Sequence, residues 1–178
     1  MLSQIPIEMR KITDPDGTSR LGAVAYLEEV LSTPDIKNRL SATEKEYESL
    51  LRQCREILIE TKTPMGRPNA RLRWELADKI HTFLNSSTRK IGVVLVNYVD
   101  AFQRDLSISE SELRYIFRFY KKYKDPKELD PRINWSKYRE LMDFSDERSR
   151  KECEMLIKVG KIKSDTDIRE FKRKLKKN

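Results

Sequence analysis

The stretch S-E-S-E-L-R-Y-I-F-R-F-Y-K-K-Y-K, residues 109–124, decides the fold class because it has the pattern of an amphipathic helix. Ser109 and Glu112 form the S-x-x-E pattern of a capping box, which predicts where this helix begins. Apolar residues recur every three or four positions and predict one buried face. They are Leu113, Ile116, Phe117 and Tyr120, and the cations of the neighbouring face, at i, i+4 and i+7, are Arg114, Arg118 and Lys121.

Two further helices are expected upstream, over about 72–84 and 89–105, from the same apolar period. In the second, the β-branched run Val93–Val96 also fits a short strand, but the spacing continues to Phe102 and favours a helix. The connector 106–108 then joins it to the quoted stretch. Two helices with so short a connector predict a helix-turn-helix.

Downstream, three more helices are expected. Trp135, Tyr138 and Leu141 predict a short one with an apolar core face, capped by Asn134 or Ser136. The next is expected to begin at Ser145 and to end at Gly160, and a basic one follows Asp165–Asp167. The whole pattern is that of a mostly α-helical protein.

The first 60 residues predict an extended arm over 1–17 and a helical hairpin over 18–60. Thr18 or Ser19 is the expected cap of a helix that runs to Leu31 and stops before Pro34. The S-x-x-E pattern at 41–44 predicts a second helix to Glu60. Its apolar stripe is expected to pack internally or to recruit a second chain. The stripe consists of Tyr47, Leu50, Leu51, Cys54, Ile57 and Leu58.

Charge divides the chain near the T-K-T-P-M-G-R-P-N segment, residues 61–69, whose prolines and glycine predict a boundary. Residues 1–60 hold 8 Lys and Arg against 11 Asp and Glu, and residues 61–178 hold 29 against 18. The net charges are therefore −3 and +11. We expect an N-terminal partner-binding part over 1–60 and a basic helix-turn-helix or winged-helix-like domain over 61–178, which faces a polyanion.

The residue types exclude the familiar catalytic and metal-binding motifs. The chain has one histidine, His81, and two cysteines, so a zinc site of the usual kind is not expected. No glycine motif for phosphate loops or nucleophile elbows occurs. We therefore expect no enzymatic activity, no catalytic or metal site and no cofactor, with His81 as a packed, hydrogen-bonded side chain.

One acidic string requires comment because it matches the spacing P-D-x18-D-x-K. It consists of Pro15-Asp16 and Asp35-Ile36-Lys37, which could hold Mg²⁺ if they lay on adjacent strands. Because residues 18–32 predict a helix and no sheet is expected, we interpret the string as coincidence.

The apolar runs and the cysteines of the chain predict its location in the cell. No uncharged apolar run approaches the ~20 residues of a spanning helix, so no membrane contact is expected. Cys54 and Cys153 lie on helical segments and are expected to be free buried thiols. This predicts a cytoplasmic protein.

From about Arg73 onward, the chain resembles the N-terminal domain of YhcG-like proteins, whose C-terminal domain has the PD-(D/E)xK nuclease fold. The matching pieces are L-R-W-E-L-A-D-K-I (72–80), L-S-I-S-E-S-E-L-R-Y-I-F-R-F-Y (106–120), I-N-W-S-K-Y-R-E-L-M (133–142) with D-E-R-S-R (146–150), and the closing S-D-T-D-I-R-E-F-K-R-K-L (164–175). Lys137 stands where the family has His, and no nuclease domain follows within the 178 residues. The resemblance therefore implies a helical DNA-binding role without catalysis.

We accordingly expect a non-catalytic protein that binds double-stranded DNA, with a nuclease subunit in trans or a second copy of itself as a further partner. The alternative is a helical adaptor that recruits a partner through the N-terminal stripe. The expected DNA-binding cations belong to the quoted helix, to the W-S-K-Y-R-E-L box and to the basic C-terminal helix, where they gain affinity by counterion release. They are Arg114, Arg118, Lys121, Lys122, Lys124, Arg139, Lys172 and Arg173.

Overall fold

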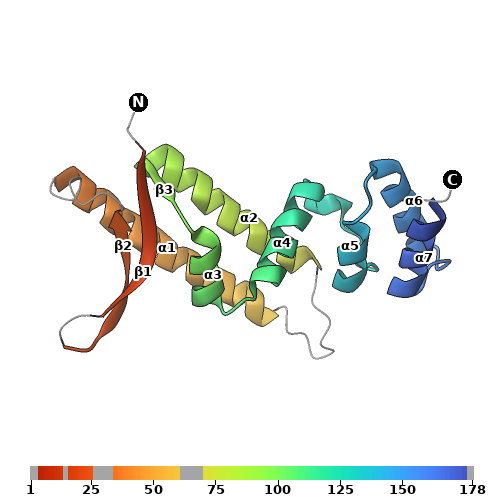
Figure 1. Cartoon of the computed structure of the whole chain (residues 1–178), viewed down its shortest axis with the longest axis horizontal. Coiled ribbons are helices and arrows are strands. Elements are labelled where there is room, and N and C mark those ends of the chain that lie inside the picture. The colour runs from red at the N-terminus through yellow and green to blue at the C-terminus, as the bar shows by residue number, and fades with distance from the viewer. Residues whose placement is uncertain (1–3, 14–15, 26–33, 61–69, 176–178) are drawn as a thin grey trace. The chain divides into compact units, whose positions relative to one another are not determined.

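The computed structural model describes residues 4–13, 16–25, 34–60 and 70–175 (Figure 1). Most of them are helical, as the sequence predicted, but three strands form a small sheet near the N-terminus. The chain divides into two compact units. Unit 1 consists of residues 1–56 and 78–113, and unit 2 consists of residues 57–77 and 114–178.

The sheet of unit 1 occupies the predicted extended arm and the start of the predicted first helix. Strands β1 (Ile5–Thr13) and β2 (Ser19–Ala25) pair antiparallel, and β3 (Val93–Leu95) pairs parallel with β1, which gives the order β2-β1-β3. The prediction of a helix from Thr18 or Ser19 is therefore wrong over β2, and its remainder, residues 26–31, lies outside the described residues.

The hairpin forms because its local sequence favours pairing over helix. Alternate side chains of β1 are buried, which is the period of a strand and involves Ile5, Ile7 and Met9. At the turn, the Asp16 carboxylate accepts hydrogen bonds from the Thr18 amide at 2.9 Å and the Thr18 hydroxyl at 2.6 Å. Thr18, which was predicted as a possible helix cap, therefore belongs to the turn of the hairpin.

Helix α1 (Pro34–Glu60) begins seven residues before Ser41, the first residue of the predicted capping box. Pro34 is the first residue of α1, where proline is tolerated because the first helical position needs no amide hydrogen. The predicted capping box is consequently wrong, since Ser41 and Glu44 lie inside the helix. The Glu44 carboxylate accepts a hydrogen bond at 2.8 Å from the backbone amide of Ala23, on edge strand β2.

The core of unit 1 is centred on Tyr47 of α1, which is completely buried. Its ring lies 5.7 Å from that of Phe83 on α2 (Ala70–Ser86) and 5.5 Å from that of Phe102 on α3 (Tyr98–Leu106). Its hydroxyl donates to the Asp105 carboxylate at 2.8 Å. Burial, followed by the Asp105 charge, raises the pKa of Tyr47 far above its usual value, so the ring stays neutral at every physiological pH.

The predicted helix over 89–105 forms only in its second half. A π-helical turn (Ser87–Ile91) follows α2, and Gly92 then adopts the left-handed conformation with φ of 72°. β3 pairs with β1 there, so the β-branched run is a strand and that part of the prediction is wrong. Asn97, also left-handed with φ of 53°, precedes α3.

The helices from residue 110 onward follow the predicted order. They are α4 (Glu110–Lys122), the 3-10 turn η3 (Pro126–Glu128), α5 (Trp135–Leu141), α6 (Glu147–Lys158) and α7 (Asp165–Leu175). The Ser109 hydroxyl accepts from the Glu112 amide at 3.2 Å, which confirms that cap. Asn134 caps α5 as predicted, whereas Asp146 caps α6 in place of Ser145.

Aromatic rings form the core of unit 2. The ring of Phe119 lies 4.9 Å from that of Tyr123, 5.1 Å from Trp135 and 5.2 Å from Tyr138. The burial predicted for Trp135 and Tyr138 is confirmed. The buried face of α4 is only partly as predicted. Leu113 and Ile116 are buried, but Phe119 and Tyr123 are buried where Phe117 and Tyr120 were expected, and the latter two are half-buried.

The structure tests two further predictions, which concern the cysteines and the absence of a membrane-spanning helix. Cys54 and Cys153 are free and buried, and burial raises the pKa of each thiol to about 12. Among the described residues, no helix has the length and apolar character needed to cross a membrane.

A test of unit 1 is the substitution Tyr47→Phe, which removes only the hydroxyl that donates to Asp105. A hydrogen bond to a charged group contributes about 1.5–3 kcal/mol, so the free energy of unfolding in urea should fall by about that amount. Tyr115→Phe is the matched control, because within the described chain its hydroxyl makes no hydrogen bond. If the free energy of unfolding falls equally in both variants, the Tyr47–Asp105 hydrogen bond does not stabilise this core.

Candidate nucleic-acid interface

Formal charge follows the two structural units. Unit 1 holds 12 Lys and Arg against 15 Asp and Glu, a net charge of −3, and unit 2 holds 25 against 14, a net charge of +11. The positive excess of the chain therefore belongs to unit 2. Every cation that the sequence predicted for DNA binding is in this unit.

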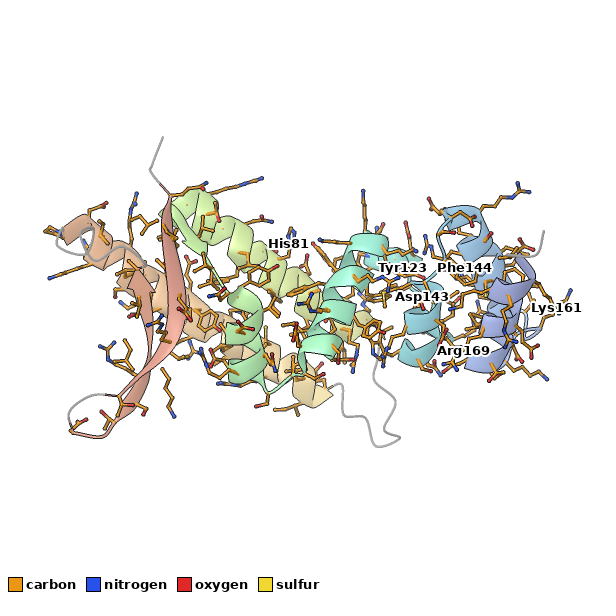
Figure 2. All side chains as sticks on the ribbon, in the orientation of Figure 1. His81, Tyr123, Asp143, Phe144, Lys161 and Arg169 are labelled. Atoms are coloured by element: carbon orange, nitrogen blue, oxygen red, sulfur yellow. The ribbon has the colours of Figure 1, made fainter. Side chains whose placement is uncertain are left out.

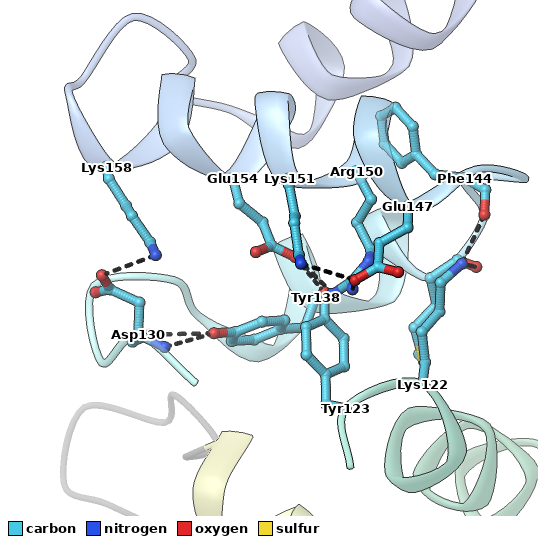
Figure 3. A network of polar contacts seen from close by, with 11 residues as sticks. Lys122, Tyr123, Asp130, Tyr138, Phe144, Glu147, Arg150, Lys151, Glu154 and Lys158 are labelled. Atoms are coloured by element: carbon cyan, nitrogen blue, oxygen red, sulfur yellow. Dashed lines mark hydrogen bonds and ion pairs between the residues drawn. The ribbon is translucent and has the colours of Figure 1, made fainter. Parts of the chain in front are cut away.

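Two of these cations, Arg118 and Lys122, bind the end of α5. The Lys122 ammonium donates to the carbonyl of Met142 at 2.9 Å and to that of Phe144 at 2.6 Å (Figure 3). The Arg118 guanidinium donates to the same Met142 carbonyl at 2.8 Å. The last carbonyls of a helix lack intrahelical donors and carry partial negative charge. Arg118 and Lys122 therefore satisfy the C-cap carbonyl of α5, at Met142, and Lys122 also binds the carbonyl of Phe144 in the turn that follows.

A third predicted cation, Lys172 of α7, reaches the same end of α5. Its ammonium lies 2.8 Å from the Glu140 carboxylate and 3.5 Å from that of Asp143. Arg169, which is labelled together with Asp143 in Figure 2, also pairs with Glu140, at 2.7 Å, and Arg118 pairs with Asp143, at 3.0 Å. Partial burial raises the pKa of Glu140, but the hydrogen bonds from Arg169 and Lys172 outweigh it and hold the pKa below its usual value.

Lys122 lies among charges of both signs, from Arg150 and Arg118 and from Asp143 and Asp146. Burial first, and then the nearby charges of Arg150 and Arg118, lower the pKa of Lys122 from its usual value. Its two acceptors are neutral carbonyls, so its charge is not paired directly.

The remaining predicted cations face solvent. Lys121, Lys124 and Arg173 are exposed and make no hydrogen bond or ion pair within the described residues. Arg114 is exposed as well. The guanidinium of Arg139 lies 4.1 Å from the ring centre of Tyr115, which ties this part of α5 to α4. Such a stacked guanidinium keeps its in-plane donors available for phosphate oxygens.

A buried polar network holds the end of α4 against α6 (Figure 3). The Tyr123 hydroxyl donates to the Glu154 carboxylate at 2.7 Å, and Arg150 donates to the same oxygen at 3.0 Å. The Arg150 guanidinium also lies 4.5 Å from the centre of the Tyr123 ring. The indole N–H of Trp74 also donates to the backbone carbonyl of Tyr123. The network fixes the direction in which the cations of α4 point.

Sequence reasoning missed four residues of this region: Glu140, Asp143, Arg150 and Arg169. The pair Arg150 and Glu154 has the i, i+4 spacing of a helical ion pair, so that signal was available. The other three are joined to their partners only by tertiary packing, and no local spacing marks them.

The helix-turn-helix prediction corresponds to α3, residues 107–109 and α4. The units divide after Leu113, so α3 belongs to unit 1 and α4 from Arg114 onward to unit 2. All three strands precede α3, and the described residues from 96 to 175 form no further strand.

The acidic string does not form a nuclease-type arrangement. Asp16 lies in the hairpin turn, and Asp35 and Lys37 lie in the first turn of α1, whereas that fold needs adjacent strands. His81 is exposed on α2, and its Nδ1 lies 2.8 Å from the Asn85 amide (Figure 2). The predicted hydrogen bond is thus present and the predicted packing is not. The described residues contain no cluster of His, Cys, Asp and Glu suited to a metal ion.

Comparison with family models, with curated proteins and with solved structures finds no match to this chain.

Neighbouring lysines provide a test of the contacts at α5. Lys122→Met removes the two hydrogen bonds to the carbonyls of Met142 and Phe144, and should lower the free energy of unfolding by about 1–3 kcal/mol. Lys121→Met, one residue away and exposed, should change it by less than about 0.5 kcal/mol. Urea unfolding followed by circular dichroism measures both, and equal effects would refute a structural role for Lys122.

Proposed function

We propose that this chain binds double-stranded DNA without catalysis, through the cationic surface of unit 2 centred on α4. The observation that carries the proposal is the concentration of the +11 charge in one structural unit while the other unit is at −3. Phosphate neutralisation by Lys and Arg supplies most of the affinity of such an interface.

The geometry of α4 supports this role. Arg114, Arg118 and Lys121 lie at i, i+4 and i+7, within about 60° of one another on a helix of 3.6 residues per turn. The buried side of α4 carries Ile116 and Phe119, so the helix cannot rotate to hide the cations. A basic helix with one buried face suits the element that a DNA-binding domain lays in the major groove.

The contacts divide seven of the eight predicted residues into two roles. Lys121, Lys124 and Arg139 are the principal DNA contacts in this proposal, with Arg114 beside them. Arg118, Lys122 and Lys172 position the surface, because each already contacts the end of α5 or its acidic side chains. A cation in this second group adds to the potential that attracts DNA.

The resemblance to the N-terminal domain of YhcG-like proteins favours the same function. In that setting a nuclease, supplied by another chain, or a second copy of this chain would be the further partner, and the cytoplasm would be its location. The adaptor alternative loses its expected surface, because four residues of the N-terminal stripe are buried in unit 1. They are Tyr47, Leu50, Leu51 and Cys54.

Duplex binding across a salt series tests the proposal. The logarithm of the association constant of the full chain should fall linearly with the logarithm of salt concentration. Lys121→Ala and Lys124→Ala should each weaken binding and flatten that slope by about one unit.

Lys45→Ala is the matched control, because Lys45 is an exposed lysine of unit 1. It should leave both affinity and slope unchanged. A wild-type chain that fails to bind duplex DNA at low salt, or an equal effect of Lys45→Ala, would contradict the proposal.

A further inference from the structure

A hollow of about 500 Å³ opens in unit 2 beside α7. Its walls come from the turn at 143–146, the first turn of α6 and the C-terminal half of α7. This volume falls within the range of about 300–1,000 Å³ that is usual for small-ligand sites. We call it the α7 hollow, and its polar walls include Ser145, Ser149, Arg169, Lys172 and Arg173.

The cations of the α7 hollow come from one face of α7, since Arg169, Lys172 and Arg173 lie at i, i+3 and i+4. Arg169 and Lys172 are held by Glu140. Arg173 has no hydrogen bond or ion pair in the part of the chain that the structure describes. Its guanidinium offers a planar pair of donors suited to phosphate oxygens.

The two carboxylates that line the α7 hollow are already engaged. Asp143 pairs with Arg118 at 3.0 Å and Lys172 at 3.5 Å. Asp146 accepts the Ser149 amide at 2.7 Å as the cap of α6, and this hydrogen bond holds its pKa below the usual value. Neither carboxylate forms an ion pair with Arg173 within the described residues.

A hydroxyl and apolar groups complete the surroundings. Ser145 makes no side-chain hydrogen bond within the described residues, so its hydroxyl is available as a donor. Phe144 and Leu175 form apolar parts of the wall. A ligand that carries a phosphate on an apolar or planar body would match both kinds of surface.

We infer that the α7 hollow binds a phosphate group, with Arg173 and Ser145 as direct donors and Lys172 as a supporting charge. The phosphate belongs either to a free phosphomonoester or to the nucleic-acid backbone, and both present the same oxygens. These residues are separate from Lys121, Lys124 and Arg139, so this inference does not require the proposed duplex contacts at α4.

The test uses the full chain, with inorganic phosphate and a nucleoside 5′-monophosphate as probes against chloride at equal ionic strength. Phosphate should shift the amide signals of Phe144, Ser145 and Arg173 in a saturable manner. Arg173→Gln should weaken phosphate binding at least fivefold, and Ser145→Ala at least twofold. Lys174→Gln is the matched control, because Lys174 is an exposed neighbour outside the lining, and it should bind like the wild type.

Competition with a duplex then separates the two sources. If the duplex displaces phosphate from the α7 hollow, the backbone is the natural ligand, and if only the monophosphate does, a free phosphomonoester is. Absence of saturable binding by either probe would overturn the inference, as would equal effects of Arg173→Gln and Lys174→Gln. Duplex affinity of the Lys121 and Lys124 variants reports on the proposed function alone.

Discussion

The buried contact among Tyr123, Arg150 and Glu154 is the constraint on which unit 2 depends. A charged pair that is almost fully enclosed is costly unless each partner is hydrogen-bonded. Here Glu154 receives both Arg150 and the Tyr123 hydroxyl, and the guanidinium also lies against the Tyr123 ring. Because Tyr123 directly follows α4, this contact fixes the helix that carries the candidate interface.

The fixed direction of α4 explains why adjacent lysines have different roles. Lys122 projects towards the end of α5 and donates to two carbonyls, whereas Lys121 projects into solvent. A single step along a helix rotates a side chain by about 100°. The positive potential of the surface is thus built partly from cations that stabilise the fold and partly from cations available to a ligand.

The sequence was sufficient for those elements whose signals are local. The Ser109 cap and the Asn134 cap predicted α4 and the start of α5, and the three-residue spacing of Trp135 and Tyr138 predicted their burial. The sheet was missed because β3 joins β1 across a long separation in the chain. The apolar residues of the short β2 fit the spacing of a helix as well as that of a strand, so this strand was missed too.

The candidate site was predictable in residue type but not in role. The sequence shows that all eight predicted residues are cations. It does not show that Arg118 pairs with Asp143 or that Lys172 pairs with Glu140, because these ion pairs depend on how α4, α5 and α7 pack. The hollow beside α7 is likewise a product of packing. No spacing in the sequence distinguishes Arg173, whose side chain is unpaired within the described residues, from its paired neighbours.

In the proposed function, unit 2 alone contacts the nucleic acid. The most direct measurement is the change in backbone amide signals of the full chain as a short DNA duplex is added. Shifts concentrated in residues 114–175, strongest along α4 and its neighbours, with residues 34–56 and 78–106 unaffected, are the predicted result. Shifts concentrated in unit 1, or no saturable shifts at low salt, would contradict it.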